Sequence, residues 1–546
     1  MSAAARARRT DESADIVVLE QSDHVSFAGC GLPYHLSGEI PHRDGLLLHT
    51  AGSLRAALDL DVRTGSRVVA IDRAAHEVTV RTADGEYRLG YDALLLAPGA
   101  VAVRPPVEGL DHPAVHTLRT VPDVDAVRAR VGRLVADHGA AGVRAVVIGA
   151  GFIGLEAVEA LRARGLQVDL VELADHVLPP MDPELAAVLA DELRAHGVGL
   201  HLGVTAQRVT PAGDGTVTVA LSDGTEVAAG LVLVNVGVRP HSDLARAAGL
   251  DLGPTGAIRV DGNHRTSDPH IWAVGDAIEV VHAVTGAVGP VPLAGPANRQ
   301  GRRAADAMLG RRTTPQADVL GTAVVRVFGL TAAVTGAGQA TLRRAGIAHE
   351  VVRVHPGHHA GFYPGSEQVR LVASFAPDGR LLGAQAVGRA GVDKRIDVLA
   401  TALRAGMTAD DLAELELAYA PPYGSAKDPV NMLGFVAQNV LDGTLPQWHA
   451  DQLEAVRSTT LVLDVRSRAE HERGHLDGAL NIPHTELRAR IDEVRLSADG
   501  RPISVHCASG VRSYLATRVL LAAGLDARNL SGGWLTLASF RPDLVA

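Results

Sequence analysis

Short apolar runs that end in a glycine or an acidic residue recur in the N-terminal half of the chain. Residues 144–148 form such a run and lead directly into a glycine-rich segment. A stretch with helical periodicity follows over 153–164, and a further apolar run over 167–172 ends in an acid. Continuous apolar runs of this length are typical of strands buried on both faces of a parallel sheet. The pattern therefore predicts an α/β fold.

The same order of elements occurs twice. Residues 15–20 predict an earlier buried strand that ends in Glu20, and residues 91–99 predict a later strand that closes in a turn. In the second copy the corresponding late strand covers 230–235 and ends near Gly237. This repetition is typical of doubly wound dinucleotide-binding folds. We therefore expect two Rossmann-like domains.

The pattern changes beyond residue 320. Strands expected over 323–327 and 369–373 are followed by helices, which predicts a separate α+β domain. A polar segment over 441–447 contains a proline and predicts a linker to a last unit of about a hundred residues, which lies within the usual range for a domain.

Composition narrows the class of protein. A chain of 546 residues is too long for one core, and its 47% apolar and 21% charged fractions are those of a globular protein. The net charge of −10, without a Lys/Arg run, argues against a nucleic-acid surface. No apolar run approaches the ~20 residues that span a membrane. Two cysteines in a chain of this length favour a reducing cytoplasm, where both thiols are either reactive or simply buried.

A glycine loop after the strand at 144–148 carries the first chemical signal. Gly149, Gly151 and Gly154 permit a tight turn and close approach of backbone N–H groups to a pyrophosphate at the helix N-terminus. Glu172 lies 18 residues beyond Gly154, where an acid can bind ribose hydroxyls. Residues 173–180 contain no Lys or Arg for a 2′-phosphate, which favours NADH over NADPH. A glycine turn in another doubly wound fold is the alternative.

The segment Thr-Ser-Asp-Pro-His-Ile-Trp-Ala-Val-Gly-Asp over 266–276 resembles the second FAD motif of two-dinucleotide flavoproteins. The resemblance implies that Asp276 faces the ribitol chain and that Glu20 binds the adenosine ribose. A helix N-cap is the alternative role of Asp276. The resemblance also implies further cofactor-binding positions, namely Val68, Gly99, Gly237 and Ala297.

The segment Ser-Phe-Ala-Gly-Cys-Gly-Leu-Pro-Tyr over 26–34 narrows the family. It resembles the branch that contains coenzyme A-disulfide reductases and NADH oxidases, whose members use one redox cysteine beside the flavin. A single thiol stores oxidation as a mixed disulfide, a persulfide or a sulfenate, so the resemblance makes Cys30 the redox centre. A small buried hydrophobe is the alternative role of Cys30.

Three further segments resemble the members that use coenzyme A, at 292–301, 388–398 and 418–429. The resemblance implies a homodimer in which Tyr419 reaches the flavin and cysteine of the partner subunit and Lys427 helps to hold coenzyme A. It also implies further substrate-binding positions, namely Arg6, Arg9, Ser26 and Asn298. A solvated basic helix face is the alternative for the two arginines.

The chain departs from this family at two places. Phe362 stands where the family often has the first of two tyrosines, so any hydrogen bond from that hydroxyl to the redox thiol is lost. A purely structural role is the alternative for Tyr363. The chain also begins inside the small-residue helix that the family places after its first strand and glycine loop. We therefore expect the strand and loop to be encoded upstream of Met1, and the chain as written to hold FAD weakly.

The C-terminal segment resembles rhodanese domains. Its landmarks are the runs over 461–466, 474–483 and 530–534. Cys507 follows a predicted strand and heads a short loop that enters a helix and ends at Arg512. Backbone N–H groups and the helix dipole in such a loop favour a thiolate and hold the outer sulfur of a persulfide. The resemblance therefore makes Cys507 a sulfur carrier.

Together these patterns predict an α/β protein with two Rossmann-like domains, an α+β dimerisation domain and an α/β rhodanese domain. The expected boundaries are 1–113 and 238–320 for an FAD-binding domain, 114–237 for an NAD(H)-binding domain, 321–440 for dimerisation and 450–546 for rhodanese. The expected activity is FAD-dependent, NAD(P)H-driven reduction of coenzyme A disulfide, persulfide or polysulfide at Cys30, coupled to sulfur transfer at Cys507. An NADH oxidase or peroxidase that uses a cysteine sulfenate, and a redox-dead scaffold with only sulfurtransferase activity, are the alternatives.

Overall fold

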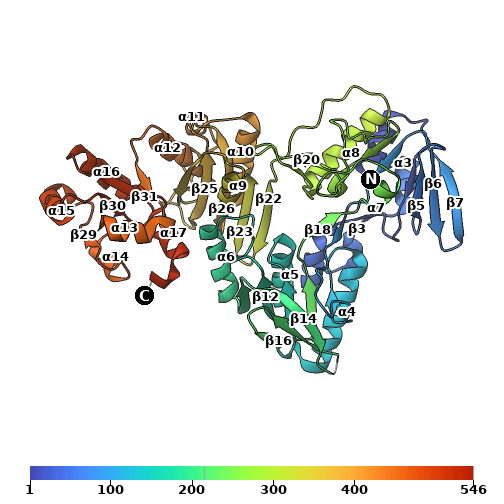
Figure 1. Cartoon of the computed structure of the whole chain (residues 1–546), viewed down its shortest axis with the longest axis horizontal. Helices are drawn as coiled ribbons and strands as arrows, with labels where there is room; N and C mark the ends of the chain where they lie inside the picture. The colour runs from blue at the N-terminus through green and yellow to red at the C-terminus, as the bar shows by residue number, and fades with distance from the viewer. Residues whose placement is uncertain (214, 545–546) are drawn as a thin grey trace. The chain divides into compact units, whose positions relative to one another are not determined.

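The computed structural model describes residues 1–213 and 215–544 and confirms the mixed α/β class (Figure 1). The chain forms two compact units. The first contains Met1–Asp175 and Arg194–Gly321, and the second contains His176–Leu193 and Thr322–Ala546. No helix of the described residues is long and apolar enough to cross a membrane.

A five-stranded parallel sheet forms one half of the first unit. Its strands in spatial order are β10 (Val115–His116), β17 (Leu231–Val234), β11 (Arg144–Ile148), β12 (Gln167–Glu172) and β13 (Val198–Leu202). Helices α4 (Val121–His138) and α5 (Phe152–Ala163) belong to the same half. Val146 and Val147 of the central strand β11 are fully buried, and each buried valine contributes about 1.5–3 kcal/mol.

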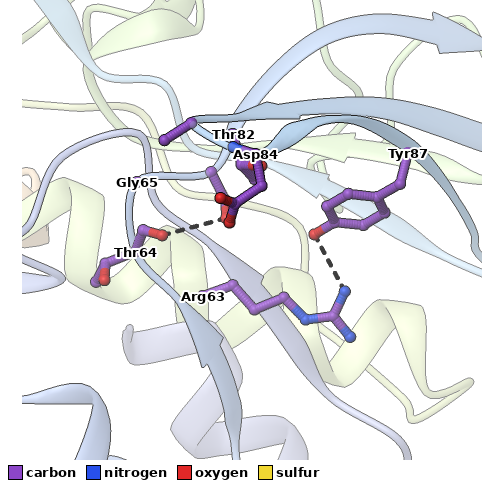
Figure 2. A pocket seen from close by; sticks show the side chains of 8 residues that line it. Arg63, Thr64, Gly65, Thr82, Asp84 and Tyr87 are labelled. Carbon is purple, nitrogen blue, oxygen red and sulfur yellow. Dashed lines mark hydrogen bonds between the residues drawn. The ribbon is translucent and has the colours of Figure 1, made fainter.

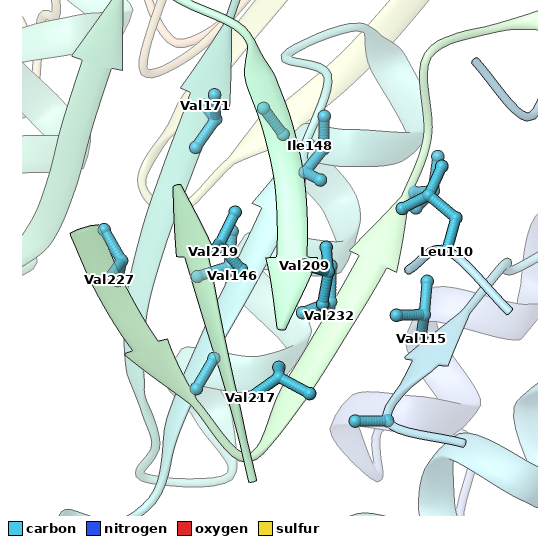
Figure 3. Packing of buried hydrophobic residues seen from close by; sticks show 14 of the residues in the cluster. Leu110, Val115, Val146, Ile148, Val171, Val209, Val217, Val219, Val227 and Val232 are labelled. Atoms are coloured by element: carbon cyan, nitrogen blue, oxygen red, sulfur yellow. The ribbon is translucent and has the colours of Figure 1, made fainter. Parts of the chain in front are cut away.

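A second layer closes the core of this half. The antiparallel strands are β14 (Ala206–Pro211), β15 (Val217–Leu221) and β16 (Glu226–Ala229). Val209, Val217 and Val219 of this layer pack in one cluster with Ile148 and Val171 of the parallel sheet (Figure 3). This valine-rich core holds the ends of β11 and β12 in place, where the glycine loop and Glu172 lie.

The other half of the first unit combines segments from both ends of its chain. β8 (Leu94–Leu96) pairs in parallel with β19 (Ile271–Ala273), and β1 (Val17–Leu19) pairs in parallel with β4 (Asp61–Arg63). The smaller pieces are β2 (Ser26–Phe27), β3 (Leu47–His49), β9 (Ala100–Ala102) and β18 (Val238–Pro240), and the sheet of β5 (Arg67–Asp72), β6 (Glu77–Thr82) and β7 (Gly85–Gly90). The helices are α1 (Ser2–Thr10), α2 (Leu32–Ser37), α3 (Ala51–Leu58), α7 (Asp243–Ala247) and α8 (Ala294–Met308).

The second unit begins with an antiparallel sheet. Its order is β22 (Ala323–Val327), β23 (Leu330–Gly336), β26 (Leu381–Gly388), β25 (Val369–Phe375) and β24 (Glu350–Val354). The helices are α6 (Pro183–Ala195), α9 (Gln339–Arg344), α10 (Val392–Ala405), α11 (Ala409–Ala413) and α12 (Pro429–Leu441). Every residue of β26 is buried, so this strand forms the centre of the domain.

The C-terminal part of the second unit is a five-stranded parallel sheet. Its order is β27 (Gln447–Trp448), β31 (Ala527–Leu530), β30 (Ile503–His506), β28 (Leu461–Asp464) and β29 (Leu480–Asn481). The helices are α13 (Leu453–Thr459), α14 (Arg468–Glu472), α15 (Ile491–Ala498), α16 (Val511–Ala522) and α17 (Gly533–Phe540). The central strand β30 ends at His506, directly before Cys507, so the sheet presents this cysteine at the carboxyl ends of its strands.

Candidate functional sites

The glycine loop between β11 and α5 has two kinds of glycine. Gly149 has φ of +102°, and a Cβ there would lie 2.5 Å from the Asn235 carbonyl oxygen. A Cβ on Gly154 would lie within 1.9 Å of the Gly149 carbonyl oxygen. A Cβ on Gly151 meets nothing within 4 Å, so this residue borders open space at the helix N-terminus. The loop therefore has the cradle that a pyrophosphate requires.

Glu172 stands at the carboxyl end of β12 beside this loop. Its Oε2 accepts a 2.7 Å hydrogen bond from the Ala150 N–H, and its Oε1 accepts one of 2.9 Å from the Ala174 N–H. Each oxygen keeps a lone pair for a further donor. The structure thus brings Glu172 and the glycine loop together, as the sequence pattern predicts for a nucleotide ribose.

A second polar site gathers around Asp276. The Arg119 Nη2 lies 3.2 Å from the Asp276 carboxylate, and Arg119 also lies next to Gly99, whose φ is +70°. Burial raises the pKa of Asp276, and Arg119 opposes that shift. The Arg119 Nε is buried and has no hydrogen-bond partner among the described residues. Unsatisfied buried donors are costly, so this site fits a hydroxyl-rich ligand such as a ribitol chain.

Glu20 follows β1, and its surroundings contain a pocket. The Glu20 Oε1 accepts a hydrogen bond of 2.8 Å from the Ser22 N–H, and the Glu20 carbonyl oxygen accepts one of 2.8 Å from the Ser66 N–H. Ser66 lines a pocket of about 580 Å³ together with residues 63–65, residues 82–84 and Tyr87. In Figure 2 Arg63 and Tyr87 lie on one side of this pocket, joined by a 3.1 Å hydrogen bond. Val68 lies two residues beyond Ser66 on β5, where the pairing with β6 is irregular.

Cys30 lies in an exposed turn before α2. The turn is fixed by its neighbours, since a Cβ on Gly31 would approach Leu46 to 2.9 Å. Within α2 the Tyr34 hydroxyl donates to the Glu156 carboxylate at 3.1 Å, which ties the cysteine segment to α5. An exposed thiol on a fixed turn is accessible to a disulfide or persulfide substrate.

Helices α1 and α8 hold three predicted substrate-binding residues, namely Arg6, Arg9 and Asn298. Ser2 is hydrogen-bonded to Asn298, and the Nδ2 of Asn298 donates to the Ala294 carbonyl oxygen at 3.0 Å. Arg6 is paired with Asp306, with its Nε 2.8 Å from Oδ1, whereas Arg9 is exposed. Of this group, only Arg9 therefore presents an exposed cation. Three other predicted positions in the first unit carry no charge, namely Ser26 on β2, Gly237 with φ of +105° and Ala297 in α8.

In the second unit a loop over residues 416–428 carries Tyr419 and Lys427, both of which are exposed. A fully buried ion pair underlies it, since the Arg395 Nη2 lies 2.8 Å from the Asp428 carboxylate. Arg395 also donates to the His358 carbonyl oxygen at 2.7 Å. A buried charge pair with satisfied hydrogen bonds fixes the backbone around it. Phe362 and Tyr363 are exposed in the same domain.

Cys507 lies at the bottom of a loop between β30 and α16 and is 1% exposed. Its Sγ accepts hydrogen bonds of 3.2 Å from the Gly510 N–H and from the Ser513 hydroxyl. The loop rests on α17, because the Trp534 N–H donates to the Cys507 carbonyl oxygen at 2.8 Å. Donors aimed at the sulfur favour an anionic form, which is what a sulfur carrier needs.

Arg512 does not stand free at the end of this loop. Its Nη1 and Nη2 lie 2.7 and 2.6 Å from the two carboxylate oxygens of Glu470 on α14. The hydrogen bonds from Arg512 lower the pKa of Glu470 to about 2, so the pair is ionised at neutral pH. Arg512 therefore braces the loop as well as supplying positive charge beside it.

Sequence reasoning missed two partners in these sites. Arg119 pairs with Asp276 across 157 positions, and Glu470 pairs with Arg512 across 42 positions. Neither residue lies in a motif segment, so no local signal identifies it. Both follow only from the three-dimensional arrangement.

Comparison with known proteins identifies the parts of the chain. The family model for pyridine nucleotide-disulphide oxidoreductases matches residues 1–295, and the model for their dimerisation domain matches residues 322–429. The model for rhodanese-like domains matches residues 445–538.

Relatives extend this result to nearly the whole chain. The chain is 34% identical to a coenzyme A disulfide reductase of Staphylococcus haemolyticus over 440 residues, which cover 80% of this chain and 96% of the relative. It is 40% identical to the reduced CoADR-RHD of Bacillus anthracis, with a TM-score of 0.95 over 100% of this chain and 97% of that one. It is 36% identical to a NAD-dependent persulfide reductase from A. fulgidus, with a TM-score of 0.91 over 98% and 97%.

Proposed function

Since the chain belongs to the pyridine nucleotide-disulphide oxidoreductase family and also contains a rhodanese-like domain, we propose that it reduces coenzyme A persulfide or coenzyme A disulfide at Cys30 with electrons from NADH. The relatives named coenzyme A disulfide reductase and NAD-dependent persulfide reductase support both substrates. The rhodanese-like domain favours the persulfide, because its own chemistry carries sulfane sulfur.

Residues of the first unit fit the ribitol chain and the adenosine end of FAD. Asp276 and Gly99 would hold its ribitol chain, and Arg119 would bind the same hydroxyls through its Nε, which has no partner among the described residues. Glu20 and Val68 would hold the adenosine end beside the pocket of Figure 2, and Gly237 and Ala297 would border the ring. When bound, FAD accepts a hydride from a nicotinamide nucleotide and passes two electrons to sulfur.

NADH is the proposed electron donor. Gly149, Gly151 and Gly154 would cradle its pyrophosphate, and Glu172 would accept hydrogen bonds from the ribose hydroxyls. A 2′-phosphate at that place would face the Glu172 carboxylate with no Lys or Arg over 173–180 to offset it. We therefore place NADPH second.

The thiol chemistry at Cys30 balances as two steps. Attack of the Cys30 thiolate on the inner sulfur of coenzyme A persulfide forms a mixed disulfide and releases hydrosulfide. The two electrons that NADH supplies then break this disulfide and return the Cys30 thiolate and free coenzyme A thiolate, with NAD⁺ and a proton as the other products. With coenzyme A disulfide, the first step releases a coenzyme A thiolate in place of hydrosulfide.

We propose substrate-binding roles for residues of the first unit and for residues of the dimerisation domain. Arg9, Ser26 and Asn298 of the first unit would contact coenzyme A, and Arg6 would contribute only if it left Asp306. Lys427 would contact a coenzyme A phosphate, and Tyr419 would reach the site of a partner subunit in a homodimer, which the dimerisation domain favours. The two free cysteines fit a reducing compartment, so we propose a cytoplasmic location.

Cys507 would transfer sulfane sulfur without net redox change. Its thiolate takes the outer sulfur of a donor such as thiosulfate or a persulfide, and the donor leaves as sulfite or a thiolate. The resulting persulfide passes that sulfur to an acceptor thiolate. The hydrogen bonds from Gly510 and Ser513 to the Sγ support this role.

The observation that carries the proposal is the contrast between two thiols, one exposed on a fixed turn and one held by donors in a loop. Cys30→Ser should abolish NADH-driven reduction of coenzyme A persulfide and spare sulfur transfer from thiosulfate to cyanide. Cys507→Ser should do the reverse. If Cys507→Ser alone stopped NADH-dependent reduction of free coenzyme A persulfide, the assignment of separate sites would fail.

The same preparation distinguishes two other functions. Fast NADH oxidation with oxygen or peroxide, without any thiol substrate, would favour an oxidase. The alternative is considered because a water-forming NADH oxidase from Lactobacillus brevis is 28% identical over 81% of this chain, with a TM-score of 0.76. Sulfur transfer without any NADH oxidation, in a protein that lacks yellow colour, would leave only the rhodanese activity.

A further inference from the structure

The Cys507 loop packs against helix α17, and the two are joined by backbone hydrogen bonds. The Trp534 and Leu535 N–H groups donate to the carbonyl oxygens of Cys507 and Ala508 at 2.8 and 2.9 Å. A Cβ on Gly533 would lie 2.7 Å from the Cys507 carbonyl oxygen, so the helix starts as close to the loop as a backbone can. The position of α17 therefore sets the position of Cys507.

The dimerisation domain holds the same helix. The Thr536 hydroxyl of α17 is hydrogen-bonded to the Nε2 of His355, which follows β24, at 2.8 Å. The Leu535 carbonyl oxygen accepts a bond of 3.2 Å from the Nη1 of Arg370 on β25, and Ser539 accepts another from the same atom. The backbone of Leu535 thus joins Ala508 of the Cys507 loop, through its N–H, to Arg370 of the antiparallel sheet, through its carbonyl oxygen.

A third contact secures the start of the helix. Arg353 of β24 packs against Gly532, where a Cβ would approach the Arg353 Cβ to 3.0 Å. Its Nε lies 2.7 Å from the Glu184 carboxylate of α6, and its Nη1 donates to the Nδ1 of His449 at 2.9 Å. Glu184 is buried and the Arg353 side chain is 9% exposed, so this ion pair is largely shielded from water and costly to break.

The charge states of the two histidines agree with this geometry. Burial, with Arg370 and Arg353 nearby, lowers the pKa of His355 to about 3, and burial lowers the pKa of His449 to about 4. Both rings are therefore neutral at physiological pH. A neutral ring can accept a hydrogen bond from an arginine and can form one with a hydroxyl, whereas a charged ring would repel both arginines.

We propose that His355 and Thr536 are positioning residues for sulfur transfer, through which the dimerisation domain fixes the geometry of the Cys507 loop. The activity of the rhodanese-like domain then depends on its contacts with the dimerisation domain. This inference rests on the proposed sulfur transfer at Cys507. It adds that the transfer depends on a hydrogen bond about 30 positions beyond the loop in the chain, made to a different domain.

The test compares Thr536→Val with Thr536→Ser in the full-length protein. Valine keeps the shape of threonine and loses the hydroxyl, whereas serine keeps the hydroxyl. We expect Thr536→Val to lower kcat for sulfur transfer from thiosulfate to cyanide by about tenfold with KM unchanged, because small misplacements of reacting groups cost up to about 10²-fold. Thr536→Ser should stay near wild type, and the pH profile of Cys507 alkylation should shift only in Thr536→Val.

Two controls separate positioning from folding. Thr517→Val removes a buried hydroxyl on α16 that has no partner among the described residues, and it should leave kcat unchanged. His355→Leu breaks the same hydrogen bond from outside the rhodanese-like domain, and it should reproduce Thr536→Val while His355→Gln retains part of the rate. NADH-driven reduction at Cys30 should stay unchanged in all of these variants.

The results of these experiments distinguish failure of the inference from failure of the proposed function. If Thr536→Val and His355→Leu match wild type in kcat and alkylation profile, the inference is wrong and the proposed function stands. The inference also fails if either variant only lowers the unfolding temperature and keeps the full kcat below it. If the wild-type protein itself transfers no sulfur, the proposed function at Cys507 is what fails.

Discussion

At the scale of single residues, the glycine loop of the first unit offers two positions, Gly151 and Gly154, where the same substitution should have different effects. Gly151→Ala adds a methyl group that meets nothing in the protein within 4 Å, whereas the same change at Gly154 collides with the Gly149 carbonyl oxygen. Gly151→Ala should raise KM for NADH about tenfold at an unchanged unfolding temperature, and Gly154→Ala should cost roughly 1–3 kcal/mol of stability. Kinetics and thermal unfolding of both variants check this. Equal loss of stability in both would contradict the proposed cradle.

Glu172 gives a second prediction at this scale. Juxtaposed like charges cost several kcal/mol, so we expect kcat/KM for NADH to exceed that for NADPH by at least about 10²-fold. Glu172→Gln removes the repulsion and should reduce the ratio of the two kcat/KM values, mainly by lowering KM for NADPH. Glu226→Gln, an exposed change on β16 of the same domain, should leave the ratio unchanged. Equal use of both nucleotides by the wild-type protein would show that the Glu172 pocket has another role.

Residues within motifs could be predicted from the sequence, and their partners could not. Gly149, Glu172 and Cys507 carry local patterns whose chemistry depends on neighbours within a loop or turn. Arg119 and Glu470 act through ion pairs that join distant segments. A charged side chain has many possible partners in a chain with 52 cationic and 62 acidic residues, so only the fold selects one.

At the scale of elements, the apolar runs located the strands, but β1 and β8, which were expected to be buried, are short and only partly buried. The strand expected over 144–148 is β11, and the helix expected over 153–164 is α5, Phe152–Ala163. The run over 91–99 contains only the short strand β8, because Pro98 and Gly99 turn the chain before β9. The grouping of residues 176–193 with the second unit was not predicted, since it depends on tertiary contacts such as the hydrogen bond between Asp182 and Gln339.

The end of β28 supports a prediction about pH. Asp464 is fully buried and accepts hydrogen bonds from Arg466 and His471, and Arg466 in turn lies over the Trp534 ring. Burial alone would raise the pKa of Asp464, but the bonds from Arg466 and the charges nearby hold it at about 2. Because the folded pKa is depressed, the stabilisation is present above the ordinary value near 4 and is lost as the pH falls toward 2.

Asp464→Asn should therefore lose about 2 kcal/mol of stability at pH 7, the value of a shift of this size. The gap between the variant and the wild type should narrow as the pH falls from 4 to 2. His506 titrates in the same window, since burial lowers its pKa to about 4 and Asp464 opposes that shift, so the gap reports this coupled pair. Denaturant unfolding at several pH values measures the gap. A gap that stays constant down to pH 2 would contradict the depressed pKa.

At the scale of the whole molecule, the chain divides its chemistry between two compact units with separate cores. The proposed nucleotide and flavin sites lie in the first unit, and Cys507 lies in the second. Linking two sites in one chain raises the effective concentration of one at the other. The chain order alone does not reveal this division, because residues 176–193 interrupt the first unit.

Two units with separate cores should unfold in separable transitions, since multi-domain chains generally depart from two-state behaviour. A ligand that binds only the native form stabilises the unit that holds its site, by about 2.7 kcal/mol at a hundred times Kd. Calorimetry with and without NAD⁺ should therefore show one transition that moves upward and another that stays. Asp464→Asn should lower the transition that NAD⁺ does not move and should leave the NAD⁺-sensitive transition unchanged. Its hydrogen-bond network lies in the second unit and touches no nucleotide site. A single transition that both changes shift equally would mean that the two units unfold as one, and the proposed independence of the two sites would then lose its thermodynamic basis.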